Sequence, residues 1–250
     1  MIDDFPAVDE EKKIGALIKT SLVDFPGRVA AALFLQGCNL RCPYCYNTEL
    51  VTGKPEDYEA VSFKQVIEHL KKRASVLTGF VISGGEPLLS PYLPRLITES
   101  RGLGYKIKLD TNGLMFDRLE RIITDPELCP DYIALDVKTS PDRYADLGGA
   151  HSPAGQMSAQ NKIKKAIELV SSLPSEKREF RTVLVPPLVS KPDIDSIAKL
   201  LPQDASWYFA QFRNENCLDP SYNDITPYTE EQVEELIRAA KEKIPNSVLR

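Results

Sequence analysis

Residues 29–47 read VAAALFLQGCNLRCPYCYN, an apolar run followed at once by a loop rich in cysteine. The first seven of these residues, 29–35, are all apolar, which is typical of a strand buried on both faces. Cys38, Cys42 and Cys45 then fall within eight residues. The sequence therefore predicts a buried strand that leads directly into a loop carrying three thiols.

Three thiols in one loop indicate a metal cluster with an incomplete ligand set. A structural zinc ion normally takes four ligands, and a cubane iron–sulfur cluster normally takes four cysteines. Three thiolates would leave one iron of such a cluster open to another ligand. No ligand-like spacing with the loop is found among the remaining candidates, Cys129, Cys217, His69 and His151. A zinc site completed by a distant residue is the alternative.

Strand-like and helix-like segments alternate along the rest of the chain. Helical repeats of apolar residues separate the strands, and two helices begin with capping boxes, Ser62 with Gln65 and Thr229 with Gln232. Six strand–helix pairs predict a parallel sheet covered by helices and are too few for a complete eight-stranded barrel. After 29–35, the expected strands are 80–82, 105–109, 132–135, 180–185 and 207–210.

The composition of the 250 residues is that of an ordinary globular protein, with 42% hydrophobic and 27% charged residues. The net charge of −5 gives no general attraction for nucleic acid or for an anionic membrane surface. No stretch reaches the roughly 20 apolar residues that cross a bilayer, and the N-terminus is acidic where a signal peptide is basic. We therefore expect a cytoplasmic protein, in which crowded cysteines favour metal over disulfides.

Polar clusters follow three of the expected strands. Residues 83–87 read SGGEP, residues 110–113 read DTNG and residues 136–138 read DVK. Adjacent glycines let a backbone approach a ligand closely, and Glu86 is an acceptor for an ammonium group. Ligands bind at the carboxyl edge of parallel sheets, so these clusters predict a binding site. Alternatively, Asp110 and Asp136 cap the helices that follow them.

The loop at 36–47 resembles the signature of radical S-adenosylmethionine (SAM) enzymes, and more narrowly that of the activating enzymes of glycyl-radical proteins. Residues 20–27, TSLVDFPG, are similar to the lead-in of the activases of anaerobic ribonucleoside-triphosphate reductase. Tyr46 departs from the pattern, since many of these activases have histidine there. The resemblance implies an α/β fold, a partial (β/α)6 barrel. It also implies one domain over residues 1–250, with its core at about 14–215 and a C-terminal loop and helix at 216–250.

The resemblance also implies the roles of individual residues. Cys38, Cys42 and Cys45 would hold a [4Fe-4S] cluster, and Tyr44 would place its ring against the adenine of S-adenosylmethionine. A monovalent cation beside the carboxylate of that cofactor would be bound by Asp110, Thr111 and Asp136. Besides Tyr44, the residues expected to bind S-adenosylmethionine are Gly84, Gly85, Glu86, Asp110, Asn112, Asp136, Lys138 and Arg181.

The implied activity is reductive cleavage of S-adenosylmethionine to a 5′-deoxyadenosyl radical, which makes a glycyl radical on a partner protein. Anaerobic ribonucleoside-triphosphate reductase is the favoured partner, and flavodoxin or ferredoxin the type of electron donor. Two alternatives stay open. One is a radical enzyme acting on a small molecule or a peptide, and the other is a non-catalytic zinc or iron–sulfur binding module.

Overall fold

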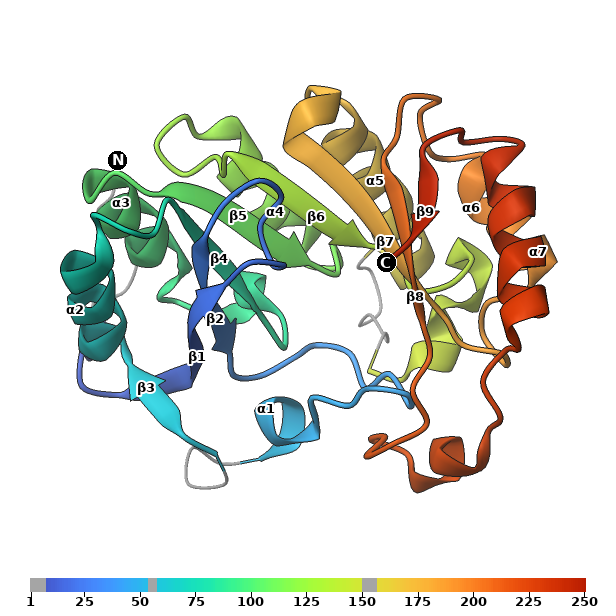
Figure 1. The fold of residues 1–250 in the computed structure, drawn as a ribbon, viewed down its shortest axis with the longest axis horizontal. Helices are drawn as coiled ribbons and strands as arrows, with labels where there is room; N and C mark the ends of the chain where they lie inside the picture. Colours follow the sequence, from blue (N-terminus) through green and yellow to red (C-terminus); the bar gives the residue numbers. More distant parts are fainter. Residues whose placement is uncertain (1–7, 54–57, 150–156) are drawn as a thin grey trace. The chain divides into compact units, whose positions relative to one another are not determined.

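A computed structural model describes residues 8–53, 58–149 and 157–250 (Figure 1). The chain forms two compact units that interleave along the sequence. Unit 1 contains Met1–Cys38, Glu49–Thr111 and Asp117–Tyr132, and unit 2 contains Asn39–Thr48, Asn112–Phe116 and Ile133–Arg250. His151 lies outside the described residues. The organisation as one domain over residues 1–250 remains a prediction.

Unit 1 is built on a mixed sheet with the strand order β3-β1-β2-β4-β5. The central strand β2 pairs in parallel with β4, and β4 with β5, whereas β1 runs antiparallel to both β2 and β3. The carboxyl ends of the parallel strands therefore share one edge, where Cys38, the SGGEP turn and Asp110 are found. The strands are β1 (Lys13–Ser21), β2 (Ala30–Leu35), β3 (Ala60–Ser62), β4 (Gly79–Gly84) and β5 (Lys106–Thr111).

The helices that follow the strands of this sheet bury one apolar face each. In α2 (Phe63–Arg73), the Ser62 hydroxyl accepts from the Gln65 amide and the Gln65 side chain accepts from the Ser62 amide, so the expected capping box is confirmed. The buried face of α2 consists of Phe63, Val66, Ile67 and Leu70. The other helical segments in this part of the sequence are α1 (Thr48–Thr52), η3 (Pro87–Leu89), α3 (Leu93–Gly102) and α4 (Phe116–Thr124).

In the C-terminal half of the chain, β6 (Tyr132–Asp136), β7 (Arg178–Leu184), β8 (Trp207–Gln211) and β9 (Ser247–Leu249) are paired in parallel in that order. The expected capping box of Thr229 and Gln232 starts α7 (Glu230–Lys241). Figure 1 shows α7 beside α6 (Lys191–Ala198). The other helical segments are η4 (Pro141–Leu147), α5 (Ala159–Ser171), η5 (Ser175–Lys177) and η6 (Pro220–Asp224).

All six expected strands are present, and three further strands, β1, β3 and β9, were not expected. The burial of β1 follows no strict alternation along its nine residues, and β3 and β9 have only three residues each. None of them is apolar along its whole length, as the expected strand at 29–35 is. The strand β7 also begins earlier than expected, at Arg178, so Arg181 lies in its middle.

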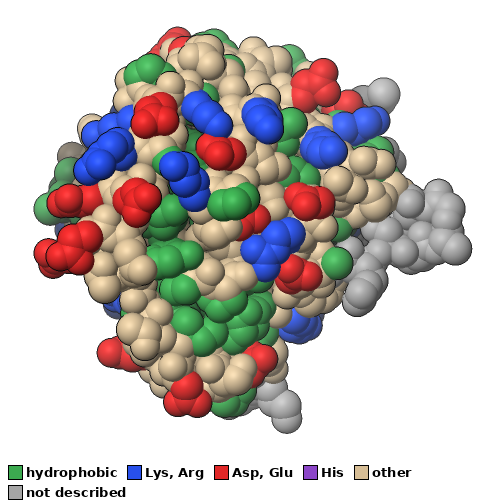
Figure 2. Space-filling model, turned by 90° about the vertical axis from the view of Figure 1, so that its right-hand side faces the viewer, with side chains coloured by type: hydrophobic (Ala, Val, Ile, Leu, Met, Phe, Trp, Pro, Cys, Tyr) green, Lys and Arg blue, Asp and Glu red, His purple; other side chains and the backbone are tan. Residues whose placement is uncertain are grey.

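On the face drawn in Figure 2, acidic and basic side chains are interspersed among the described residues, and neither sign forms a continuous patch. Within residues 8–53, 58–149 and 157–250, no helix is both long and apolar enough to span a bilayer.

Candidate functional site

In unit 1, the glycine turn after β4 is bonded to the start of the cysteine loop. The Gly85 amide donates to the Leu35 carbonyl and the Glu86 amide donates to the Gly37 carbonyl, both at 2.8 Å. A Cβ on Gly85 would lie 2.0 Å from the Gly37 oxygen and 3.3 Å from the Cβ of Cys38. Gly84 has a φ of +120°, which L side chains rarely adopt. The two glycines therefore allow a close backbone approach beside the first cysteine.

We expect the substitution Gly85→Ala to destabilise the protein by about 1–3 kcal/mol, because the new methyl group would overlap a backbone oxygen that cannot move freely. Urea unfolding followed by circular dichroism measures this change. The matched control is Gly102→Ala at the end of α3, where a Cβ would meet nothing within 4 Å. A Gly85→Ala protein as stable as the control would show that the close approach of the two backbones is not required.

The Glu86 side chain is completely buried, and its contacts fix its orientation. Its Oε1 accepts a hydrogen bond from the Thr111 hydroxyl at 2.7 Å and another from the Leu88 amide at 3.1 Å. A buried carboxylate is costly unless hydrogen bonds or charges satisfy it. The predicted ligand residues Glu86 and Thr111 are thus brought into direct contact.

Lys108, which the sequence interpretation missed, is the ion-pair partner of Asp110. Its Nζ lies 2.5 Å from the Asp110 Oδ1, and the two side chains are only 2% and 10% exposed. The sequence does contain a signal for this pair, because side chains two residues apart in a strand point to the same face. Lys108 therefore shares a face of β5 with Asp110, while Ile107 and Leu109 fill the other face.

In unit 2, Asp136 forms ion pairs with two other residues predicted to bind the cofactor. Asp136 and Arg181 are register partners on β6 and β7, and the Arg181 Nε lies 2.7 Å from the Asp136 Oδ1. The Lys138 Nζ lies 3.3 Å from the Asp136 Oδ2. Removal from water alone would raise the pKa of Asp136, but Arg181 and Lys138 lower this pKa to about 2.

Neither aspartate acts as a helix cap. Asp110 lies inside β5, and the next helix, α4, begins only at Phe116. Asp136 ends β6, and the residue that precedes η4 at its N-terminus is Ser140. The capping alternative is therefore wrong for both residues, and their carboxylates serve in ion pairs instead.

The lowered pKa of Asp136 gives a pH prediction. Because this pKa is about 2 in the folded protein and 3.8 ordinarily, the stability that the ion pairs contribute is complete above about pH 4. That stability is lost as the pH falls through about 2. We expect Arg181→Met to raise the pKa of Asp136 and shift the loss to higher pH. A 13C NMR titration of this carboxyl measures both values.

The control for this titration is Arg238→Met, which removes an exposed guanidinium from α7. It is expected to leave the Asp136 titration unchanged. Equal Asp136 pKa values in the Arg181→Met protein and the parent protein would contradict the assignment.

Two other segments of unit 2 hold the central part of the cysteine loop by its backbone. The Arg41 amide donates to the Gly148 carbonyl at 3.0 Å. On the other segment, the Leu218 amide donates to the Cys45 carbonyl and the Asp219 amide to the Pro43 carbonyl, both at 2.9 Å. Two consecutive loop positions, 148 and 149, have positive φ angles of 64° and 68°. These backbone hydrogen bonds fix the conformation of residues 41–45.

Asn112, also predicted to bind the cofactor, contacts the cysteine loop directly. Its Nδ2 donates to the Asn39 Oδ1 at 2.8 Å, and its own Oδ1 accepts from the Leu114 amide at 3.0 Å. Its side chain is buried. The amide therefore ties the turn after β5 to the loop in unit 2.

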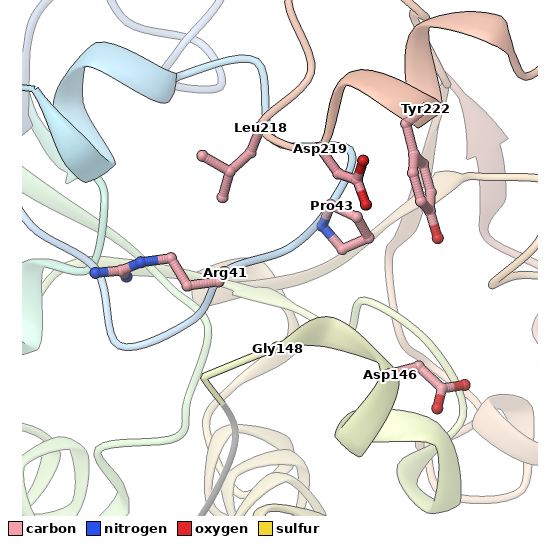
Figure 3. Close-up of a pocket in the computed structure, with 7 residues that line it drawn as sticks. All are labelled: Arg41, Pro43, Asp146, Gly148, Leu218, Asp219 and Tyr222. Atoms are coloured by element: carbon pink, nitrogen blue, oxygen red, sulfur yellow. The ribbon is translucent and has the colours of Figure 1, made fainter.

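A cavity of about 470 Å³ lies within unit 2, beside the cysteine loop (Figure 3). Its walls come from the loop itself, from the end of η4 and from the segment that leads into η6. They carry one guanidinium, two carboxylates and a phenol. The lining residues are Arg41, Pro43, Asp146, Gly148, Leu218, Asp219 and Tyr222.

The donor groups of the loop fit an iron–sulfur cluster in their chemistry. Among the described residues, Cys38, Cys42 and Cys45 form no disulfide bond, and Cys42 is buried. Thiolates are the soft ligands that iron–sulfur clusters take. Among the described residues, no three His, Cys, Asp or Glu side chains converge as they would around a metal ion. The assignment of the three thiols to a cluster therefore stays a prediction that rests on their type and spacing.

Tyr44 is buried, and its hydroxyl has no hydrogen-bond partner among the described residues. Burial raises the pKa of its phenol well above the usual value, against an opposing effect of Lys138. The Lys138 backbone amide donates to the hydroxyl of a second buried tyrosine, Tyr144, at 3.2 Å. A buried hydroxyl without a partner is costly, and a polar ligand beside it would satisfy it.

The two remaining cysteines differ in their surroundings. Cys217 is buried in the segment that bonds to the loop, and burial, with a smaller effect of Cys45 and Asp219, raises the pKa of its thiol. Cys129 is partly exposed in unit 1, where its carbonyl accepts from Arg101 at 2.6 Å. The approach of Cys217 to the loop had no local signal in the sequence.

Comparisons with known proteins identify the class of the chain. Residues 33–199 match the model of the Radical SAM superfamily. A protein of Methanocaldococcus jannaschii, provisionally named glycyl-radical enzyme activating enzyme, is 29% identical over 238 residues, which are 95% of each chain. The pyruvate formate-lyase-activating enzyme of Clostridium pasteurianum is 29% identical over 76% of each chain. The 7-carboxy-7-deazaguanine synthase of Hyperthermus butylicus is 36% identical over 95 residues, 36% of this chain and 37% of that one.

Solved structures show the same fold. QueE from Escherichia coli superposes with a TM-score of 0.58 at 15% identity, over 95% of this chain and 93% of that chain. Streptococcus suis SuiB bound to S-adenosylmethionine gives a TM-score of 0.60 at 16% identity, over 86% of this chain and 48% of that chain. These matches confirm the expected fold class, the α/β partial barrel of the radical SAM type.

Proposed function

Because this chain belongs to the Radical SAM superfamily, we propose that it is a glycyl-radical activating enzyme, which removes a hydrogen atom from a glycine Cα of a partner protein. The observation that carries the proposal is the similarity to the activating enzyme of M. jannaschii over 95% of both chains. Similarity over 76% of both chains to a pyruvate formate-lyase-activating enzyme supports it.

Enzymes of this superfamily use a [4Fe-4S] cluster and S-adenosylmethionine. When bound, these groups supply a reductive cleavage that yields methionine and a 5′-deoxyadenosyl radical. In this chain Cys38, Cys42 and Cys45 would hold the cluster and leave one iron for the amino and carboxylate groups of S-adenosylmethionine. The backbone bonds from Gly148, Leu218 and Asp219 hold the loop in place for that task.

The chain's other contribution is to bind and orient S-adenosylmethionine. Glu86 is held in its orientation by Thr111 and Leu88, and its carboxylate would accept from the ammonium of the cofactor. Lys138 and Arg181 would attract the cofactor carboxylate, and Asp136 keeps both cations at defined positions. Tyr44 would pack against the adenine, and Asn112 would support the loop.

The favoured partner is an anaerobic ribonucleoside-triphosphate reductase, and the electron donor a flavodoxin or a ferredoxin. Support comes from residues 20–27, TSLVDFPG, which resemble the lead-in of the activases of that reductase. In the structure, Leu22 and Val23 of this segment are 76% and 84% exposed.

A second candidate is a radical enzyme acting on a small molecule. The observation that favours it is the 36% identity to a 7-carboxy-7-deazaguanine synthase, although this covers only 36% of the chain. The longer similarity to activating enzymes makes it the weaker candidate.

Deuterium transfer distinguishes these candidates. The reductase encoded in the same genome would be labelled with deuterated glycine and incubated anaerobically with the reconstituted enzyme, S-adenosylmethionine and reduced flavodoxin. We expect 5′-deoxyadenosine that carries one deuterium atom by mass spectrometry. A reductase variant with alanine at the radical glycine should give no deuterated 5′-deoxyadenosine. Unlabelled 5′-deoxyadenosine from the labelled reductase would overturn the proposal.

A further inference from the structure

The expected monovalent cation at Asp110 does not agree with the charges that surround this residue in unit 1. The expectation comes from the resemblance to glycyl-radical activases. Asp110 already has a positive partner, because the Lys108 ammonium lies 2.5 Å from its Oδ1. A second cation at the same oxygen would be repelled by the first at close range.

Lys108 is a buried residue beside Asp110 and not an exposed surface lysine. Its side chain is 2% exposed and it is among the largest completely buried residues of the described chain. A lysine is almost never fully buried unless its charge is paired. The neighbouring Lys106 on the same face of β5 shows the contrast, since it is 54% exposed and pairs with Asp131 at 2.7 Å.

The second carboxylate expected to bind the cation is engaged in a similar way. Within unit 2, Asp136 is paired with Arg181 at 2.7 Å and with Lys138 at 3.3 Å. The two carboxylates expected to bind the cation therefore have three cationic side chains of their own.

We propose that the Lys108 ammonium is the resident cation of the Asp110 site, and that the protein binds S-adenosylmethionine without an added monovalent cation. An ammonium is a compact charge with three donors, so it can bond to Asp110 and still attract a second carboxylate. Lys108 is thus a positioning residue that acts through Asp110. The proposal rests on the proposed function, in which S-adenosylmethionine is the cofactor, and on the expectation that Asp110 lies beside the carboxylate of that cofactor.

The test measures S-adenosylmethionine binding by calorimetry to the cluster-loaded enzyme, in tetramethylammonium buffer and with added K⁺ or Na⁺. For the parent protein, we expect the dissociation constants with and without these ions to agree within about twofold. Without the ions, Lys108→Met should bind about tenfold more weakly, because the negative charge of Asp110 would then repel the carboxylate of the cofactor. Added K⁺ should restore much of that loss. Lys106→Met, the matched control, should behave like the parent protein.

A second measurement requires no S-adenosylmethionine and no enzymatic activity of the variant. Broadening of the 23Na NMR line reports sodium bound to the cluster-loaded protein, and we expect a saturable effect for Lys108→Met only. Saturable broadening with the parent protein, or an affinity for S-adenosylmethionine that rises about tenfold with K⁺, would overturn the proposal. A folded Lys108→Met protein with unchanged affinity and no response to K⁺ would also overturn it.

The two measurements separate this proposal from the proposed function. A cluster-loaded parent protein that binds no S-adenosylmethionine in any buffer would contradict the cofactor assignment itself. If Lys108→Met does not fold, the parent protein's response to K⁺ and its 23Na line still decide the question.

Discussion

The substitution Cys42→Ser is expected to abolish assembly of the iron–sulfur cluster and, with it, all cleavage of S-adenosylmethionine. Serine is nearly isosteric with cysteine, but its hydroxyl is a hard, protonated ligand that does not replace a thiolate on iron. Cys42 is 7% exposed, so the similar size of serine keeps the packing of the loop. Iron and sulfide contents and the visible absorbance after reconstitution measure the effect. Cys38→Ser and Cys45→Ser should behave alike.

Cys129→Ser is the matched control, since Cys129 is also a cysteine outside any disulfide bond but lies outside the loop. It should assemble the cluster as the parent protein does. Each variant is expected to fold, because the backbone hydrogen bonds of residues 41, 43 and 45 do not involve the thiols. Far-ultraviolet circular dichroism tests this. A Cys42→Ser protein with a full complement of iron and sulfide would contradict the assignment of the ligands.

The second large effect is expected from Glu86→Gln, which should weaken S-adenosylmethionine binding by about 100-fold, a typical cost of removing one charge from a buried ion pair. Glutamine has nearly the same shape, and its carbonyl oxygen can still accept from Thr111 and Leu88. The fold should therefore survive, while the charge that attracts the cofactor ammonium is lost. Titration of the reduced cluster with S-adenosylmethionine, followed by electron paramagnetic resonance, gives the affinity.

Glu99→Gln provides the control for this experiment. Glu99 pairs with Arg95 at 2.6 Å on α3, where both side chains are about one third exposed. Losing that surface pair should change stability by less than about 1 kcal/mol and leave cofactor binding unaltered. An unchanged affinity in Glu86→Gln would show that the ammonium is recognised by other groups.

The strands β2 and β4 could be predicted because most of their side chains are buried. Five of the six residues of β2 are buried, and the first four of β4 are buried as well, so both appear as apolar runs. The strand β1 carries Lys13 and Lys19 and is exposed along three consecutive residues, so it has no comparable pattern. Its place in the sheet depends on pairing with β2 and β3, which no local signal reveals.

The candidate site was predictable where its residues are close in the sequence. The cysteine spacing, the glycine turn and the strand-end carboxylates could each be found from short stretches. The pairing of Asp136 with Arg181 joins residues 45 positions apart and depends on the register of β6 and β7. Likewise, the segment at 217–219 meets the cysteine loop only through the fold. The pairing of Lys108 with Asp110 could have been predicted, because residues two apart in β5 lie on the same face of the strand.

The proposed function requires that this chain make a glycyl radical on a protein partner. Its most direct test is the electron paramagnetic resonance spectrum of an anaerobic mixture of the enzyme, S-adenosylmethionine, reduced flavodoxin and the ribonucleoside-triphosphate reductase of the same genome. We expect the doublet of a glycyl radical, which collapses to a single line when the reductase contains deuterated glycine. Formation of 5′-deoxyadenosine in this mixture without any protein radical would contradict the proposed function.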